Sequence, residues 1–304
     1  MLISVDHGNK QVKTAHKIFT SGLRESAVRP ALGEEYIEYQ GRYYALTNQR
    51  LSYRRDKSSD ESYFVLTLFA IAYEALAANA YNESGTLSVD LLIGLPPAHY
   101  GAQYKRFEAY FARGQVEFFF GDRPFTLFLN SVTAYPQAYA AAMSVFSQVR
   151  AMPKCIVVDI GGFTTDYLVM HNGAPDLASC SSMEHGVIAL YNRCINEING
   201  SFDLLLSESD VDQVLLGAED CLPTNVQKVI RGQAALFVDE LVNRLREQMI
   251  DLRVTRTVFT GGGALLLKHY LTQCERVGQC LFVEDIRANA KGYELLYKIS
   301  NAGR

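Results

Sequence analysis

Apolar and polar positions along the chain follow two periods, and the order of these segments predicts an α/β protein. Continuous apolar runs of strand length occupy 1–5, 87–95, 155–159 and 254–260, and a glycine lies at or shortly after the end of each run. Residues 233–249 have apolar side chains at spacings of three and four, the pattern of an amphipathic helix. Further helices are expected at 62–81, 99–113, 131–149, 186–199, 207–216, 261–271 and 289–300. Further strands are expected at 12–19, 36–39, 43–46, 116–120, 124–129, 165–170 and 281–283.

The most apolar window, residues 63–80, is about as long as a membrane span, yet its composition favours a buried helix. Glu74 lies within the window, and alanines make up much of its second half. A carboxylate in a lipid-facing helix would be costly, whereas a helix that is apolar on all sides suits a protein interior. We therefore expect no membrane partner.

The two halves of the chain repeat one order of elements. Each begins with an apolar strand, an Asp-x-Gly turn and a second strand, at 1–19 and again at 155–170, and continues with further strands and helices. Such a repeat indicates duplication of an α/β domain, and a length of 304 residues suits two domains. We expect domain I at 1–150 and domain II at 151–287.

The composition indicates a folded protein without a basic surface. Apolar residues make up 48% and charged residues 20%, and the net charge of −4 argues against direct binding of nucleic acid. The six cysteines form no C-x-x-C pair and no histidine cluster accompanies them, so no zinc site is expected. The N-terminus lacks the pattern of a signal peptide, and reduced thiols suit a cytoplasmic protein.

Three glycine-containing turns have residues of the kind that bind nucleotide phosphates. In the first, Asp6 ends an apolar strand and Gly8 lets backbone N–H groups approach a ligand. Asn9, Lys10 and Lys13 lie just beyond and suit a phosphate. An ordinary hairpin turn with surface lysines has the same pattern, so this turn alone does not decide between the two interpretations.

The second turn has the sequence Asp159-Ile160-Gly161-Gly162-Phe163-Thr164-Thr165-Asp166. Its glycines and threonines supply donors for phosphate oxygens, although a glycine-rich turn between core strands would look alike. The third, Thr260-Gly261-Gly262-Gly263, leads into a helix and permits close approach of a flat ligand, or forms a simple linker. Together the turns predict a clamp in which two hairpins hold the β- and γ-phosphates, while Asp6 and Asp159 hold Mg²⁺ through water.

The order of these turns resembles the actin, Hsp70 and sugar-kinase ATPase superfamily over nearly the whole chain. Asp6–Lys13 is similar to its first phosphate motif, Asp159–Asp166 to its second, and Thr260–Ala264 to its adenosine motif. Ser131–Ala138 resembles its first connecting helix and Ala288–Gly292 its second. The resemblance implies duplicated actin-like (ribonuclease H-like) domains, each a mixed sheet flanked by helices. It also implies small outer subdomains at about 20–60 and 185–235, and a C-terminal helix at 288–304 that returns to domain I.

Within the superfamily, the chain resembles the ParM or StbA type of plasmid-segregation actin. The spacing from Asp6 to Lys13, the form of Asp159–Asp166 and the segment Gly94-Leu95-Pro96-Pro97 are similar to that branch. The resemblance implies a homopolymeric filament that assembles with ATP, or GTP in its place, and Mg²⁺ in the interdomain cleft. It also implies hydrolysis within the polymer, and a DNA-binding adaptor protein that links the filament to a centromere-like site on a plasmid.

The resemblance further implies roles for single residues. Asp6 and Asp159 would hold hydrated Mg²⁺ and orient the attacking water, and Gln137 would position that water near the γ-phosphate. Binding residues would be Gly8, Asn9, Lys10, Lys13, Gly161, Gly162, Phe163, Thr164, Asp166, Gly261, Gly262 and Gly263. Many ParM-like proteins have an acidic residue in place of Gln137, and glutamine is a poor general base, so slow, polymer-activated hydrolysis is expected. His7 has no assigned role, and a solvent-exposed turn residue is one interpretation of it.

Three other functions stay open. They are a non-polymerising assembly or scaffold protein that binds ATP only to fix its shape, a small-molecule kinase of the same fold, and a phosphatase of the exopolyphosphatase type. The sequence has no sugar-binding signature that favours the kinase. Retention of both Asp6 and Asp159 favours hydrolysis over binding alone.

Overall fold

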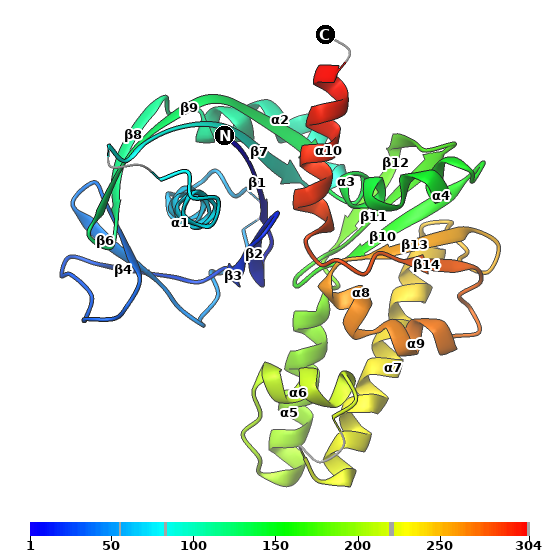
Figure 1. The fold of residues 1–304 in the computed structure, drawn as a ribbon. Helices are drawn as coiled ribbons and strands as arrows, with labels where there is room; N and C mark the ends of the chain where they lie inside the picture. The colour runs from blue at the N-terminus through cyan, green and yellow to red at the C-terminus, as the bar shows by residue number, and fades with distance from the viewer. Residues whose placement is uncertain (55, 82–83, 219–221, 303–304) are drawn as a thin grey trace. The chain divides into compact units, whose positions relative to one another are not determined.

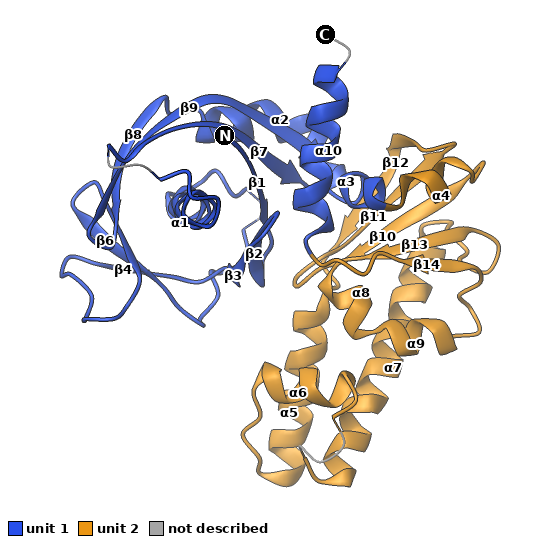
Figure 2. Cartoon of the chain, viewed as in Figure 1, with its two compact units in different colours: residues 1–144, 287–304 blue, residues 145–286 orange. Residues whose placement is uncertain are grey.

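The computed structural model describes residues 1–54, 56–81, 84–218 and 222–302 (Figure 1). The chain divides into two compact units, with residues 1–144 and 287–304 in unit 1 and residues 145–286 in unit 2 (Figure 2). Each unit is built on its own sheet and buries its own apolar core. The chain is therefore an α/β protein with two sheets, as its pattern of apolar positions predicts.

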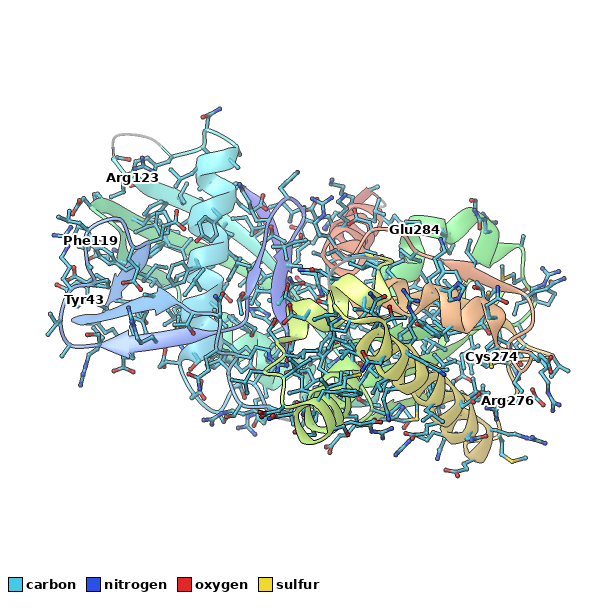
Figure 3. The ribbon with its side chains drawn as sticks, turned by 90° about the horizontal axis from the view of Figure 1, so that it is seen from below. Tyr43, Phe119, Arg123, Cys274, Arg276 and Glu284 are labelled. Carbon is cyan, nitrogen blue, oxygen red and sulfur yellow. The ribbon has the colours of Figure 1, made fainter. Side chains whose placement is uncertain are left out.

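Unit 1 contains a nine-stranded mixed sheet of order β3-β2-β1-β7-β9-β8-β5-β6-β4. Its strands are β1 (Leu2–His7), β2 (Gln11–Thr14), β3 (Ile18–Thr20), β4 (Leu23–Ser26), β5 (Tyr36–Tyr39), β6 (Arg42–Leu46), β7 (Thr86–Leu95), β8 (Gln115–Phe120) and β9 (Arg123–Pro136). Strands β1, β7 and β9 are parallel, and all other neighbours pair antiparallel. Tyr43, Phe119 and Arg123 mark the side of the sheet that lies away from β1 and β2 (Figure 3).

Unit 2 contains a five-stranded mixed sheet of order β12-β11-β10-β13-β14. Its strands are β10 (Cys155–Ile160), β11 (Thr165–His171), β12 (Ala174–Met183), β13 (Arg256–Thr260) and β14 (Cys280–Phe282). Strands β10, β13 and β14 are parallel, while β11 and β12 pair antiparallel. Taken in order, β12, β11, β10, β13 and β14 have the same relative directions as β3, β2, β1, β7 and β9 of unit 1. The predicted duplication is therefore confirmed at the level of the fold.

Helix α1 (Ser62–Ala77) lies inside the curved sheet of unit 1 (Figure 1). Phe64, Leu68 and Ile71 are completely buried, and nearly every other residue of the helix is buried too. A helix that contacts β1, β2 and β5 around its circumference needs apolar side chains on all faces. The apolar window is therefore a core helix, as predicted. Within the described residues, no helix is long and apolar enough to cross a membrane.

Glu74 is buried in α1 and is engaged by the turn between β2 and β3. Its Oε1 accepts hydrogen bonds from the Thr14 hydroxyl and from the backbone N–H of His16, the latter at 3.1 Å. Its Oε2 lies 2.7 Å from Nδ1 of His16. A buried carboxylate without such partners would strongly destabilise the fold. These contacts tie α1 to the β2–β3 hairpin.

The C-terminal helix of unit 1 packs close to the backbone of other elements. Unit 1 also contains α2 (Pro97–Phe111), α3 (Tyr139–Ala142) and α10 (Ala288–Ala302), and α10 lies against α3, β1 and β7. A Cβ atom added at Gly292 would collide with the Ala140 carbonyl of α3. Likewise, a Cβ at Gly94 of β7 would collide with the Tyr293 ring. Both glycines therefore allow α10 to approach closely.

The helices of unit 2 pack with its sheet. They are α4 (Phe146–Arg150), α5 (Val187–Phe202), α6 (Glu208–Leu215), α7 (Thr224–Glu247), α8 (Gly262–Leu266) and α9 (Lys268–Gln273). Charged pairs connect α7 to α5 and to the segment after α9. Arg193 of α5 donates two hydrogen bonds to Glu240 of α7, at 2.7 and 2.8 Å. Arg276 (Figure 3) donates to Asp239 of α7 at 2.6 Å. These pairs fix α7 against its neighbours at the rim of the core.

The secondary structure differs from the prediction in several places. The strand expected at 12–19 is two strands, β2 and β3, joined by a turn, and β4 had no predicted counterpart. The expected helix at 131–149 begins only at Tyr139, because 131–136 is the end of strand β9, where Pro136 pairs with Leu95 of β7. Val132 and Thr133 are β-branched and favour the extended conformation. Strand β12 had no predicted counterpart, because its polar residues are mostly half-buried or exposed and show no apolar alternation.

The cysteines of the described residues form no disulfide. Cys155 and Cys194 are buried, while Cys180, Cys274 and Cys280 are half-buried. Burial raises the pKa of the Cys194 thiol to about 12, which keeps it protonated and unreactive. The sixth cysteine, Cys221, lies outside the described residues.

The contact between Gly292 and Ala140 leads to a test with two identical substitutions. Gly101 lies in α2 with open space where a Cβ would point. We expect Gly101→Ala to raise the free energy of unfolding by about 0.5–1 kcal/mol, because alanine favours the helix. Gly292→Ala should lower it by about 1–3 kcal/mol, because α10 must move away from α3. Urea denaturation measures both, and a Gly292→Ala protein as stable as Gly101→Ala would contradict the close contact.

Candidate functional site

The carboxylate of Asp6 is the centre of a small polar cluster in unit 1. Asp6 is the fifth residue of β1, pairs with Lys13 of β2 across the antiparallel ladder, and is only 3% exposed. The side-chain amide of Gln137 donates to Asp6 Oδ1 at 2.7 Å. The Lys13 ammonium lies 3.9 Å from Asp6 Oδ2. The fold therefore brings together three of the predicted site residues, from β1, β2 and the end of β9.

Gln137 reaches Asp6 because of the parallel ladder of β1, β7 and β9. The ladder pairs Val5 with Ile93, and Leu95 with Pro136, so the three strands end at one edge of the sheet. The backbone N–H of Gln137 then donates to the Leu95 carbonyl at 2.8 Å and extends the ladder by one bond. Residues 131 positions apart thus meet through a hydrogen bond between buried side chains.

The backbone turns sharply directly after Gln137. Ala138 has φ 60° and ψ −54°, and the N–H of Tyr139 donates to the Gln137 carbonyl at 2.6 Å. This geometry is a γ-turn of the positive-φ type, which is rare for a residue other than glycine and costs about 1–3 kcal/mol. The N–H of Ala138 donates to the side-chain oxygen of Asn289 in α10, at 3.0 Å.

Gly8 shapes the first hairpin. Its N–H donates to the Asp6 carbonyl at 3.0 Å, and a Cβ at this position would lie 2.5 Å from the carbonyl oxygen of Gln11. The turn is therefore too tight for a side chain at Gly8, as a close phosphate loop requires. Asn9 is half-buried at the tip of the turn, and Lys10 follows it.

The second hairpin, in unit 2, places Asp159 in the position that Asp6 has in unit 1. Asp159 is the fifth residue of β10, pairs with Asp166 of β11, and is 8% exposed. The N–H of Gly161 donates to the Thr164 carbonyl at 2.9 Å and closes the turn. The Thr164 hydroxyl donates to Asp166 Oδ2 at 3.1 Å. Phe163 lies at the tip of this turn and is half-buried.

The first turn of α5 supports the second hairpin from behind. The N–H groups of Val187 and Ile188 donate to the carbonyls of Gly161 and Gly162, at 3.1 and 2.9 Å. Gly186, which precedes α5, has no room for a Cβ against Gly162.

The three glycines after β13 have different surroundings. Gly261 has φ +90°, and a Cβ on it would collide with the carboxylate of Asp159, whose partner in the parallel ladder is the preceding residue, Thr260. A Cβ on Gly263 would lie 2.6 Å from the Ile160 side chain. Gly262 is exposed, and a Cβ there meets nothing within 4 Å. Close packing therefore leaves no room for a side chain at Gly261 or Gly263, whereas Gly262 borders open space.

His7, next to Asp6, is fully buried, so the interpretation as an exposed turn residue was wrong. Its ring is stacked on Phe111 with a centroid distance of 5.2 Å, and Nε2 lies 2.7 Å from the Thr67 hydroxyl of α1. That hydroxyl donates to the Tyr63 carbonyl, so it accepts from His7 and the ring proton resides on Nε2. Lys57 donates to the backbone carbonyl of His7.

Burial and the nearby charge of Lys57 lower the pKa of His7 to about 3. Its Nδ1 atom is buried without a hydrogen-bond partner among the described residues. Protonation there would place a second positive charge in an apolar pocket. His7 is therefore a neutral side chain that attaches the first hairpin to α1 and α2.

The comparisons with known proteins agree with this geometry. Residues 157–273 match the family described as archaeal actin homologue MreB-like, C-terminal. No curated protein matches the chain. The crystal structure of the actin-like protein Alp7A is 16% identical, with a TM-score of 0.81 over 100% of this chain and 98% of that one. The chain has the actin-like fold.

Two further structures have the same fold. Ta0583, an archaeal actin homologue in complex with ADP, is 17% identical, with a TM-score of 0.75 over 98% of this chain and 99% of that one. A 15-stranded ParM filament from Clostridium botulinum is 18% identical, with a TM-score of 0.75 over the same shares. The predicted fold class, duplicated actin-like domains with mixed sheets and flanking helices, is thereby confirmed.

Sequence reasoning missed two contributors to the unit 1 cluster of this actin-like chain. The strained conformation of Ala138 has no signature in the sequence, since alanine rarely adopts a positive φ. Asn289 was noted only as part of a connecting motif, and its hydrogen bond to Ala138 spans 151 positions. An asparagine in the first turn of a helix was the available signal, because its side chain readily binds a neighbouring backbone group.

The buried, neutral His7 leads to a prediction of pH dependence. The unfolded chain binds a proton at this residue below about pH 6.5, whereas the folded actin-like chain does not until about pH 3. His7 therefore does not lower the free energy of unfolding above about pH 6.5. Below that value the free energy of unfolding falls by about 1.4 kcal/mol for each pH unit. His7→Gln keeps a donor for Thr67 but removes the titrating ring. Urea denaturation from pH 7 to 5 should show a shallower loss of stability in this variant, and an unchanged slope would contradict a neutral His7.

Proposed function

We propose that this chain is an ATP-dependent, filament-forming ATPase of the ParM or StbA type that segregates plasmid DNA. The observation that carries the proposal is the repeated placement of a buried aspartate beside a glycine turn, at the carboxyl end of a central parallel strand in both sheets. Ligands of open α/β sheets bind at such strand ends. The actin-like fold supports it, since one structure with this fold is an ADP complex and another is a ParM filament.

The residues of both hairpins suit the phosphates of one nucleotide. The N–H groups of Gly8 and Gly161 close their own turns, but the lack of a side chain at either residue would let phosphate oxygens approach the neighbouring backbone. Lys13, already beside Asp6, would supply a positive charge. In unit 2, the Thr164 hydroxyl would turn from Asp166 to a phosphate oxygen, and the exposed Gly262 leaves open space for the nucleoside. In this proposal units 1 and 2 are the two predicted nucleotide-binding domains.

The two aspartates also fit a magnesium ion. Mg²⁺ keeps much of its water and uses only one or two carboxylates together with phosphate oxygens. Asp6 and Asp159 are nearly buried at strand ends, where a carboxylate would hold water of a hydrated ion in a fixed direction. The ion would neutralise charge on the phosphates. Within the described ranges, no cluster of three potential metal-binding side chains occurs.

Gln137 would orient the attacking water in this proposal. Its amide nitrogen donates to Asp6, which leaves the amide oxygen to accept from a water molecule. A glutamine directs a water molecule but takes up its proton poorly, so hydrolysis should be slow in the free protein. Polymerisation would then complete the site and accelerate hydrolysis. ATP is the expected nucleotide, with GTP as the alternative.

The proposal includes two kinds of protein partner. The chain itself would be the first, because filaments occur among the proteins with this fold. A DNA-binding adaptor at a centromere-like plasmid site would be the second, since the net charge of −4 does not favour direct contact with DNA. Plasmids lie in the cytoplasm, and we propose that location for the protein.

Addition of Mg-ATP should cause assembly and release of phosphate. Light scattering should rise above a critical protein concentration, electron microscopy should show filaments, and ADP should give little of either. Asp159→Asn removes the charge that would hold hydrated Mg²⁺ and keeps the shape of the side chain. This variant should release phosphate at least about tenfold more slowly, as is typical when one catalytic group is removed.

Asp176→Asn, on β12 of the same sheet and away from the hairpin, is the matched control and should behave as the wild type. Both variants should keep the wild-type unfolding midpoint. Binding of ATP without scattering at any protein concentration would favour the non-polymerising scaffold. Wild-type turnover in Asp159→Asn would exclude the second hairpin from the chemistry.

A further inference from the structure

The strained turn at Ala138 lies between two fixed points. On one side, Gln137 is bound through its backbone N–H to Leu95 and through its side chain to Asp6. On the other, the Ala138 carbonyl accepts the N–H of Ala142 at 2.9 Å, which begins α3. The chain must therefore change from strand to helix within one residue, and it does so at a positive φ.

A backbone in this conformation persists only where its surroundings hold it. Ala138 is completely buried, so its N–H has no access to water and must be paired within the protein. The side-chain oxygen of Asn289, itself only 9% exposed, accepts from this N–H at 3.0 Å. Without that acceptor, the turn would hold both a strained residue and an unpaired buried donor.

The position of Asn289 is itself fixed by close packing of α10. One turn further along the helix, Gly292 lies against the Ala140 carbonyl of α3, and Tyr293 lies against Gly94 of β7. Tyr293 is also stacked on Tyr135 of β9, with a centroid distance of 6.1 Å. Asn289 therefore presents its oxygen from a helix that is wedged against both strands leading to the site.

We propose that Asn289 is a positioning residue for Gln137. By holding the strained turn at Ala138, it keeps the Gln137 amide on Asp6 and its free oxygen directed at the attacking water. This inference rests on the proposed ATPase function and adds to it a residue that does not touch the nucleotide. Loss of the Asn289 acceptor lets the turn relax, Gln137 leaves Asp6, and turnover falls while nucleotide binding remains.

The test uses Asn289→Ala, Asn289→Leu and Asn289→Asp in the full-length chain. Alanine and leucine lack the acceptor, and leucine matches the branching of asparagine but is larger. Aspartate keeps the acceptor oxygen and suits the first turn of α10, where a carboxylate is favoured. Asn301→Ala, an exposed position on the same helix, is the matched control.

Phosphate release per polymerised protomer should fall at least about tenfold in Asn289→Ala and Asn289→Leu, while the Kd for Mg-ATP changes less than about threefold. Asn289→Asp and Asn301→Ala should stay within about threefold of the wild-type rate. Hydrogen exchange measures the turn without reference to activity. In the two variants without an acceptor, amides of 138–142 should exchange faster than in the wild type.

A second substitution tests whether strain is the cause. Glycine adopts positive φ without a steric penalty, so Ala138→Gly in the Asn289→Ala background should restore the rate at least about threefold. A merely structural role for Asn289 gives no such recovery.

The possible outcomes distinguish a failure of the proposed ATPase function from a failure of the proposed role of Asn289. A wild-type chain that releases no phosphate contradicts the proposed function. A wild-type chain that hydrolyses ATP, with Asn289→Leu folded and equally fast, overturns the role of Asn289. Equal loss of turnover in Asn289→Asp and Asn289→Leu, or no recovery with Ala138→Gly, overturns it as well.

Discussion

The parallel pairing of three strands in each sheet is the constraint on which the rest of the structure depends. In unit 1 it aligns the ends of β1, β7 and β9, and in unit 2 the ends of β10, β13 and β14. Parallel strands need long crossover connections, so residues far apart in the chain meet at the edge where the strands end. Asp6 meets Gln137 in this way, and Asp159 meets Gly261.

Helices and neighbouring side chains hold these strand ends in place. In unit 1, α1 fills the curved sheet with apolar side chains, and His7 attaches the end of β1 to it as a neutral ring. Helix α10 returns from the far end of the sequence and wedges against α3 and β7. The positive φ of Ala138 directly follows Gln137, and among the described residues Nδ1 of the neighbouring His7 has no hydrogen-bond partner.

The sequence predicts the parts of this arrangement that depend on local patterns. Apolar runs that end in Asp6 or Asp159 before glycine are visible in any window of ten residues, and so is the buried helix at 63–80. Residues 131–136 were predicted to be helical because the alanine-rich segment that follows favours a helix. Two β-branched residues and Pro136 favour a strand, but this signal is weaker. Only the ladder with β7 decides between the two conformations.

Other features depend on contacts that no local window contains. Strand β12 is polar, and its pairing with β11 alone makes it a strand. The burial of His7 depends on rings from α1 and α2, and the N–H of Ala138, a residue with positive φ, is paired with an acceptor 151 positions away. The site residues stay predictions, because the structure shows where the aspartates and glycines lie but their roles rest on resemblance.

The proposed function requires that the hairpins of both units bind the same nucleotide. Titration calorimetry with a non-hydrolysable Mg-ATP analogue, below the assembly concentration, tests it in the wild type, Lys13→Ala and Gly262→Val. A Cβ at position 262 meets no protein atom within 4 Å, and equal unfolding midpoints of Gly262→Val and the wild type should show that the valine obstructs only a ligand. The account predicts one site per chain, weakened at least about tenfold by either substitution. Two independent sites, or an effect from only one of the two units, would contradict it.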